Sequence, residues 1–130
     1  MENFGAYIRA GVNMGLGTDT TPHNLVEEMR KAAVLARIAA RDIATVTTSD
    51  VLHAATIGGA RALMRDDLGR IALNGKADLV LVDLTVPQMR PVRDPTALLH
   101  LPCGRPRRVR CLCRRAAGRG RSKGADHEPE

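Results

Sequence analysis

The sequence predicts an α/β fold in which one strand is followed by two helices and then by a small β element. Three patterns give this order: a short apolar run at 11–17, two helical apolar repeats within 25–63, and two apolar runs on either side of Asn74-Gly75. A single strand that leads into helices has no neighbouring strand with which to pair its backbone. We therefore expect these elements to be part of something larger.

The first element is the run Gly-Val-Asn-Met-Gly-Leu-Gly at 11–17, which is followed by Thr18, Asp19, Thr20 and Thr21. A short apolar run that ends in glycine and polar turn residues is typical of a buried strand leading into a turn. Asp19 is thus expected just beyond the end of this strand.

Two helices are predicted next. Asn24 precedes Leu25, and Glu27 follows three positions later, as in a capping box, so a helix is expected to run from Leu25 to about Arg41. A second helix start is expected at Ser49. The pair Gly58-Gly59 interrupts that helix at a cost of roughly 1 kcal/mol for each glycine relative to alanine. This pair predicts either close packing against a neighbour or a break.

The β element comes from two short apolar runs, Gly69–Ala72 and Ala77–Asp83, which flank the pair Asn74-Gly75. This arrangement predicts a hairpin. Three prolines then indicate an extended, irregular stretch, at Pro87, Pro91 and Pro95.

Charge divides the chain in two. Residues 1–100 contain 11 Lys/Arg and 11 Asp/Glu, whereas residues 101–130 contain 9 and 3, so the whole net charge of +6 belongs to the tail.

No stretch approaches the roughly 18–20 apolar residues that span a bilayer, and the sequence that begins at Met1 does not read as a signal peptide. We expect a cytoplasmic protein without membrane contact.

Four motifs in series resemble the amidohydrolase superfamily, in the branch of cytosine deaminase and triazine chlorohydrolase, over about residues 4–99. They are Gly11–Thr20, Glu28-Met29-Arg30, Ala54–Leu63, and Gly69–Ala72 with Gly75–Asp83; Pro91–Pro95 completes the match. The resemblance implies a fragment of a (β/α)8 metal-dependent hydrolase barrel, with the last strand and C-terminal helices at 1–66. It also implies that 67–100 form the C-terminal part of a small β-sandwich.

The resemblance also implies a chemistry for Asp19. Family members hold a divalent metal, zinc or iron, with a His-x-His pair, a third histidine and this aspartate. The metal lowers the pKa of bound water towards about 7, and the aspartate moves the proton of that water to the leaving group. The intact family thus acts on carbon–nitrogen bonds other than peptide bonds, or on carbon–halogen bonds, of small-molecule substrates. Asp19 is the predicted catalytic residue and, in the intact family, a metal ligand.

The histidines limit this interpretation. His23, His53, His100 and His127 include no His-x-His pair and match no ligand position of the family. A catalytic metal site needs about three protein ligands. We therefore expect this chain alone to bind no metal and to be inactive. His23 either lines the mouth of a pocket or is a solvated loop histidine; His53 is expected to pack on a helix or to lie at the surface.

The tail at 101–130 allows three interpretations. Its arginines favour polyanion binding, and the alternative function is therefore a non-catalytic interaction fragment, although the tail has no aromatic residue for stacking on nucleic acid bases. A zinc site would need Cys103, Cys111, Cys113 and His100, whose spacing is unusual.

The third interpretation of the tail is a reading-frame shift after about His100. With permitted codons, a one-base shift across Arg110–Arg121 gives D-V-Y-V-D-G-R-P-V-V, similar to a strand of the family. On that hypothesis the tail is disordered. The sequence does not define the oligomeric state.

Overall fold

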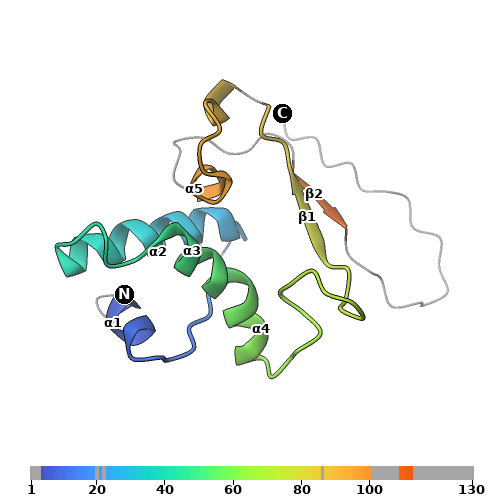
Figure 1. The fold of residues 1–130 in the computed structure, drawn as a ribbon, viewed down its shortest axis with the longest axis horizontal. Helices are drawn as coiled ribbons and strands as arrows, with labels where there is room; N and C mark the ends of the chain where they lie inside the picture. Colours follow the sequence, from blue (N-terminus) through green and yellow to red (C-terminus); the bar gives the residue numbers. More distant parts are fainter. Residues whose placement is uncertain (1–3, 20, 22, 86, 101–108, 113–130) are drawn as a thin grey trace.

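The computed structural model describes residues 4–19, 21, 23–85, 87–100 and 109–112. The helices in this part of the chain are α1 (Phe4–Arg9), α2 (Leu25–Ala40), α3 (Thr48–His53), the π-helical turn η1 (Ala54–Gly58), α4 (Gly59–Ala62), the 3-10 turn η2 (Pro87–Met89) and α5 (Pro95–His100); the strands are β1 (Leu79–Val82) and β2 (Val109–Leu112) (Figure 1).

Helix α2 forms where the sequence predicts it. Asn24 is its N-cap, and the Oδ1 atom of Asn24 accepts a hydrogen bond from the Glu27 backbone N–H at 3.3 Å. The helix ends at Arg41, which adopts a left-handed conformation with φ of 52° and donates its N–H to the carbonyls of Arg37 and Ile38. Both ends are therefore fixed by hydrogen bonds that local sequence supplies.

Helix α3 begins two residues earlier than predicted, because Thr47 and not Ser49 starts it. Thr47 Oγ1 accepts from the Asp50 N–H at 3.1 Å, and Asp50 Oδ2 accepts from the Thr47 N–H at 2.8 Å, which completes a capping box. Asp50 lies three positions after Thr47, the spacing that this motif requires.

The predicted interruption at Gly58-Gly59 takes the form of a π-helical turn. The helix continues from α3 through η1 into α4 without an intervening loop, as the continuous green ribbon in Figure 1 shows. Gly58 also makes the close approach that the glycine pair predicts, because a Cβ atom there would overlap the carbonyl oxygen of Met14. The pair thus marks both an irregular turn and a tight contact.

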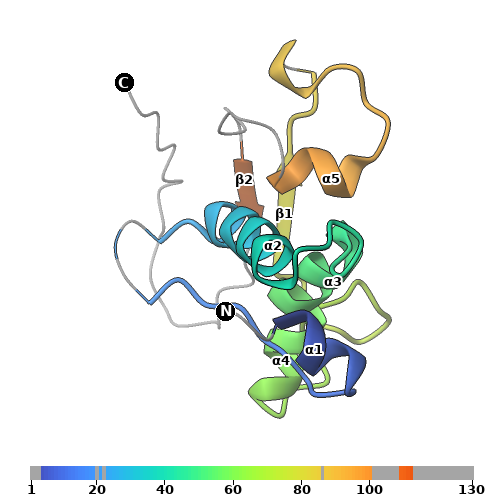
Figure 2. The same ribbon diagram turned by 90° about the vertical axis from the view of Figure 1, so that its left-hand side faces the viewer.

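The core lies where α1, α3 and α5 pack against α2 (Figures 1 and 2). The buried side chains of this cluster are small or aliphatic apart from one phenylalanine: Phe4, Met29, Ala32, Ala33, Ala36, Val46, Val51 and Ala54. Three alanines on one face of α2 let the neighbouring helices approach its backbone. Burying a valine or methionine side chain such as Val51 or Met29 stabilises the fold by about 1.5–3 kcal/mol.

The predicted buried strand at 11–17 is instead an extended segment, which continues to Asp19 and is mostly exposed. Among the described residues no strand runs beside it. Its hydrogen bond from Leu16 N–H to the Ala54 carbonyl, at 3.2 Å, goes to a helix rather than to a sheet. The run at 11–17 has the residue pattern of a strand, but no neighbouring strand in the described part of the chain pairs with its backbone or covers its side chains, so these stay mostly exposed.

The predicted hairpin is wrong, although its turn is present. Asn74 has φ of 63° and the Gly75 N–H donates to the Ala72 carbonyl at 3.0 Å. Residues 69–72 do not pair with 77–83. Asp67 binds Arg65 and Lys76 through its carboxylate, at 2.7 and 3.2 Å, and this ties 65–76 into a compact loop.

Strand β1 pairs with β2, antiparallel, from Leu79 opposite Leu112 to Val82 opposite Val109. This pairing corrects the expectation of a disordered tail at 109–112, whereas 101–108 and 113–130 lie outside the described residues. A β-sandwich needs two sheets packed face to face, and the described residues contain a single two-stranded sheet, so the β-sandwich stays a prediction.

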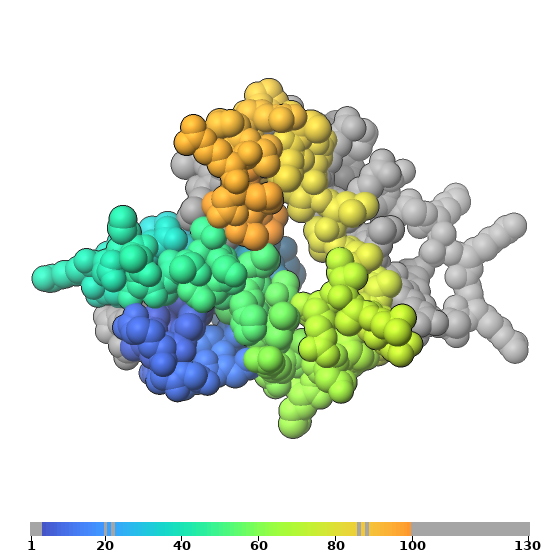
Figure 3. Space-filling model, in the orientation of Figure 1, coloured from blue at the N-terminus to red at the C-terminus, as the bar shows by residue number. Residues whose placement is uncertain are grey.

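Figure 3 shows the loop and β1, in yellow-green and yellow, beside the helices. Within the described ranges, no helix combines the length and apolar content needed to cross a membrane.

Candidate functional site

The candidate site is built on the end of the extended segment. Asp19 lies there with its side chain exposed and its backbone in the left-handed region, at φ of 50°. Aspartate tolerates this conformation better than most residues other than glycine. No hydrogen bond or ion pair joins its carboxylate to another described residue, so this carboxylate is available to a ligand.

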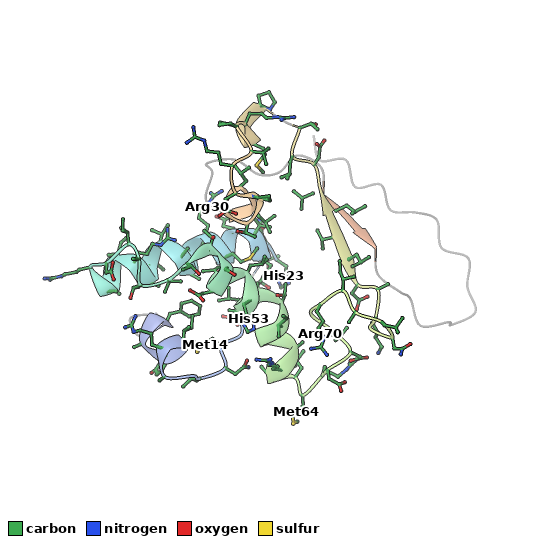
Figure 4. All side chains as sticks on the ribbon, in the orientation of Figure 1. Met14, His23, Arg30, His53, Met64 and Arg70 are labelled. Atoms are coloured by element: carbon green, nitrogen blue, oxygen red, sulfur yellow. The ribbon has the colours of Figure 1, made fainter. Side chains whose placement is uncertain are left out.

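A hydrogen bond next to Asp19 organises the turn. Thr18 Oγ1 and His23 Nδ1 lie 2.9 Å apart, which fixes His23 beside the segment that carries Asp19. His23 is exposed, as expected of a loop histidine, and its Nε2 takes no part in this bond. Figure 4 labels it just before α2, whereas His53 lies on α3. Nothing in the sequence predicted the bond, because threonine and histidine five residues apart form no known motif.

Three other aspartates make hydrogen bonds or ion pairs that stabilise the local structure around them. Asp50 caps α3, Asp67 binds Arg65 and Lys76, and Asp94 caps α5 by accepting the Thr96 N–H at 2.9 Å. Hydrogen bonds from Thr96, first from its side chain, hold the pKa of Asp94 below its ordinary value. Asp19 has no such local contact among the described residues, and neither has the carboxylate of Asp66.

The described residues do not fit a metal ion on their own. They include no group of three or more histidine, cysteine, aspartate or glutamate side chains close enough to hold one. Asp19 and His23 together would supply at most two ligands, short of the roughly three of a catalytic site.

An open cavity of about 210 Å³ lies elsewhere, at the beginning of the extended segment. It is bounded by Gly11–Met14 on one side and by α3 and α4 on the other, with Asp50, His53 and Arg61 as its charged or titratable lining. Asp19 is not among its lining residues, so this cavity is separate from the candidate site.

The chain matches a known protein family over most of its length. The model of the amidohydrolase family matches residues 1–106. The chain belongs to the amidohydrolase family.

The amidohydrolase relatives that resemble this chain include several deaminases. The chain is 41% identical over 92 residues to a 5-methylthioadenosine/S-adenosylhomocysteine deaminase of Natronomonas pharaonis, which is 68% of this chain and 21% of the relative. It is 40% identical over 89 residues to the protein of the same name from Haloarcula marismortui, covering 65% and 20%.

Solved amidohydrolase structures share the fold. An adenosine deaminase from Xanthomonas campestris, crystallised with bound zinc, superposes with a TM-score of 0.71 at 38% identity, over 77% of this chain and 24% of that one. A triazine hydrolase variant superposes with a TM-score of 0.74 at 28% identity, over 84% and 25%. The chain thus spans about a fifth of the curated relatives and about a quarter of these structures.

Proposed function

We propose that this protein takes part in the hydrolysis of a carbon–nitrogen bond outside peptides, in which an amino group is removed from a heteroaromatic ring, and that Asp19 is its proton-transferring carboxylate. One observation carries the reaction class: the relatives reported above at 38–41% identity are all named as deaminases. The carbon–halogen alternative has less support, because the triazine hydrolase variant is 28% identical.

The reaction needs a group that moves protons. Water adds through its oxygen to the ring carbon that carries the amino group, the carbon–nitrogen bond breaks, and ammonia leaves. The water loses one proton and the departing nitrogen gains one. A carboxylate that accepts the first and delivers the second returns to its starting state, and such general acid–base catalysis contributes about 10²- to 10⁴-fold.

Asp19 is suited to this task because its carboxylate is exposed and has no hydrogen-bond partner among the described residues. Its position at the end of the extended segment supports the same assignment, since catalytic groups of (β/α)8 barrels lie at the carboxyl ends of strands. A divalent metal, zinc or iron, belongs to the proposal only in a complete barrel. There Asp19 would be one of its ligands, and the others would come from residues that this chain does not contain.

The test places the chain in a complete barrel. Residues 4–100 replace the matching segment of the Xanthomonas campestris adenosine deaminase, and deamination is measured with Asp19 intact and as Asp19→Asn. We expect kcat to fall by about 10²- to 10⁴-fold in Asp19→Asn. Asparagine tolerates the left-handed backbone, so this substitution removes the charge without disturbing the turn.

Asp42→Asn is the matched control. Asp42 is also an exposed aspartate, and it accepts the Ala44 N–H at 2.8 Å, a bond that an amide oxygen can also make. We expect unchanged kcat. If Asp19→Asn keeps more than half of the activity of the intact chimera, Asp19 has no catalytic function.

The comparisons give no support to the alternative of a non-catalytic fragment that binds polyanions. None of the relatives described above is named for such binding, and the basic residues on which that interpretation depended lie almost wholly outside the described part of the chain.

A further inference from the structure

The segment that carries Asp19 touches the helix at two glycines. A Cβ at Gly58 would overlap the carbonyl oxygen of Met14, and a Cβ at Gly15 would lie 3.3 Å from the Cα of Gly59. We call this the glycine contact, meaning residues 13–16 against residues 54–59. Only backbone-to-backbone packing fits at this distance, so the contact leaves the segment little freedom to move towards the helix.

Two hydrogen bonds fix the register of the glycine contact. Asn13 Nδ2 donates to the Gly58 carbonyl at 3.0 Å, and the Leu16 N–H donates to the Ala54 carbonyl at 3.2 Å. These carbonyls are the first and last of the π-helical turn. The segment therefore meets this turn at both of its ends, as a strand would meet a partner strand.

The glycine contact ends three residues before Asp19. Thr18 is held in turn by His23, so the backbone from Leu16 to Thr18 is fixed at both ends. A slip by one residue would move an extended chain by about 3.3 Å and turn its side chains to the opposite face. A misplacement of about 1 Å can already cost 10²-fold in rate.

We infer that Asn13 is a positioning residue: with the Gly58 carbonyl it sets the register of the segment on the π-helical turn and thereby places the Asp19 carboxylate. The inference rests on the function proposed for Asp19, because the exact position of the Asp19 carboxylate matters only if that carboxylate takes part in the reaction. Asn13 itself lies six residues from Asp19 and takes no part in the chemistry.

The first experiment uses the full 130-residue chain, labelled with 15N and 13C. Gly58→Ala should speed hydrogen exchange at the Leu16 amide at least about tenfold and change the backbone carbon shifts of Asp19, because the new methyl group must displace Met14. Gly59→Ala is the matched control, since the nearest atom to its Cβ is the Ala54 carbonyl oxygen at 3.7 Å, an ordinary contact. Both variants gain the helix propensity of alanine, so only their contacts differ.

Gly17→Ala controls for changes in the segment itself, because a Cβ at Gly17 meets nothing within 4 Å. We expect both controls to keep the exchange rate of Leu16 and the shifts of Asp19. If Gly58→Ala does not fold, Asn13→Ala replaces it, since that change removes one hydrogen bond and adds no atoms.

The second experiment measures kcat and KM in the chimera described above. Asn13→Ala should lower kcat by about 10²-fold, with KM changed much less, and Asn13→Gln should restore part of the loss because it keeps the donor. A purely structural contact would lower stability in Asn13→Ala without this separation of kcat from KM.

The two proposals fail separately. If Asn13→Ala leaves the Asp19 shifts and kcat unchanged while Asp19→Asn abolishes activity, the positioning inference is wrong and the proposed function stands. If Asp19→Asn is active, the proposed function fails whatever Asn13 does, and the positioning inference fails with it.

Discussion

Arg41 and Asp19 both hold left-handed backbone angles, but for different reasons. Asp19 belongs to the class of residues that tolerate this region, whereas Arg41, at φ of 52°, does not and is held there by the end of α2. The conformation costs a residue with a Cβ atom about 1–2 kcal/mol. Glycine is the usual residue at this position of a helix end.

Arg41→Gly should therefore stabilise the fold, by about 0.5–1 kcal/mol in the free energy of unfolding. The matched control is Ala39→Gly, an exposed position inside α2, which should destabilise by a similar amount because glycine is a poor helix former. Urea unfolding of both variants checks the pair. A loss of stability in Arg41→Gly, as in the control, would show that Arg41 is not strained.

Single residues also define the limit of sequence-based inference about the site. Asp19 was predicted as the catalytic residue because four motifs in series placed it, and this role stays a proposal. The Thr18–His23 bond and the Asn13–Gly58 bond were not predicted. Both depend on distances across the fold, and a local pattern of residue types does not contain such distances.

At the scale of elements, the two predicted helices were confirmed, whereas α1 and the pairing of the sheet were not predicted. The stretch expected to be extended at Pro87–Pro95 instead contains η2 and the start of α5. Caps such as Asn24 and Thr47 act within three residues, so their signal is present in any short stretch of sequence. The partner of β1 is about thirty residues away, and Asn74-Gly75 formed its turn without bringing the flanking runs together. The start of α3 was misplaced because Thr47 and Ser49 are both good N-caps, and only Asp50 distinguishes them.

Thr47→Ala should cost about 1 kcal/mol of stability, since it removes the side chain that accepts the Asp50 N–H. Ser49→Ala should change stability by less than about 0.5 kcal/mol, because Ser49 is exposed and lies inside the first turn. Thermal or urea unfolding compares them. A larger loss in Ser49→Ala than in Thr47→Ala would mean that the helix starts at Ser49.

For the whole molecule, two aspartates make stability depend on pH. The Arg65 guanidinium, and after it Lys76, hold the pKa of Asp67 far below its ordinary value. Bonds from Thr96 and from the Ala97 N–H lower the pKa of Asp94. Because both pKa values are lower in the folded state, their contribution is complete above about pH 4, the unfolded pKa of aspartate, and is lost as pH falls through the folded values.

The free energy of unfolding should consequently fall as the pH drops below about 4 and through the lowered pKa values of Asp67 and Asp94. The double variant Asp67→Asn/Asp94→Asn should be less stable at pH 7 but should lose less on acidification, because asparagine does not titrate. Urea unfolding at a series of pH values measures both slopes. Equal slopes would assign the acid sensitivity to other carboxylates.

The π-helical turn at 54–58 has a consequence for how this protein can change in evolution. Such a turn closes i→i+5 hydrogen bonds and holds one residue more than the α-helical turns around it, so deleting a residue there would restore an ordinary helix and remove the bulge. Gly69 also approaches this turn, since a Cβ there would lie 2.8 Å from the Thr56 carbonyl oxygen. Other segments therefore pack closely against this turn at Gly58 and at Thr56, and a lineage that lost the bulge would have to adjust both contacts at once.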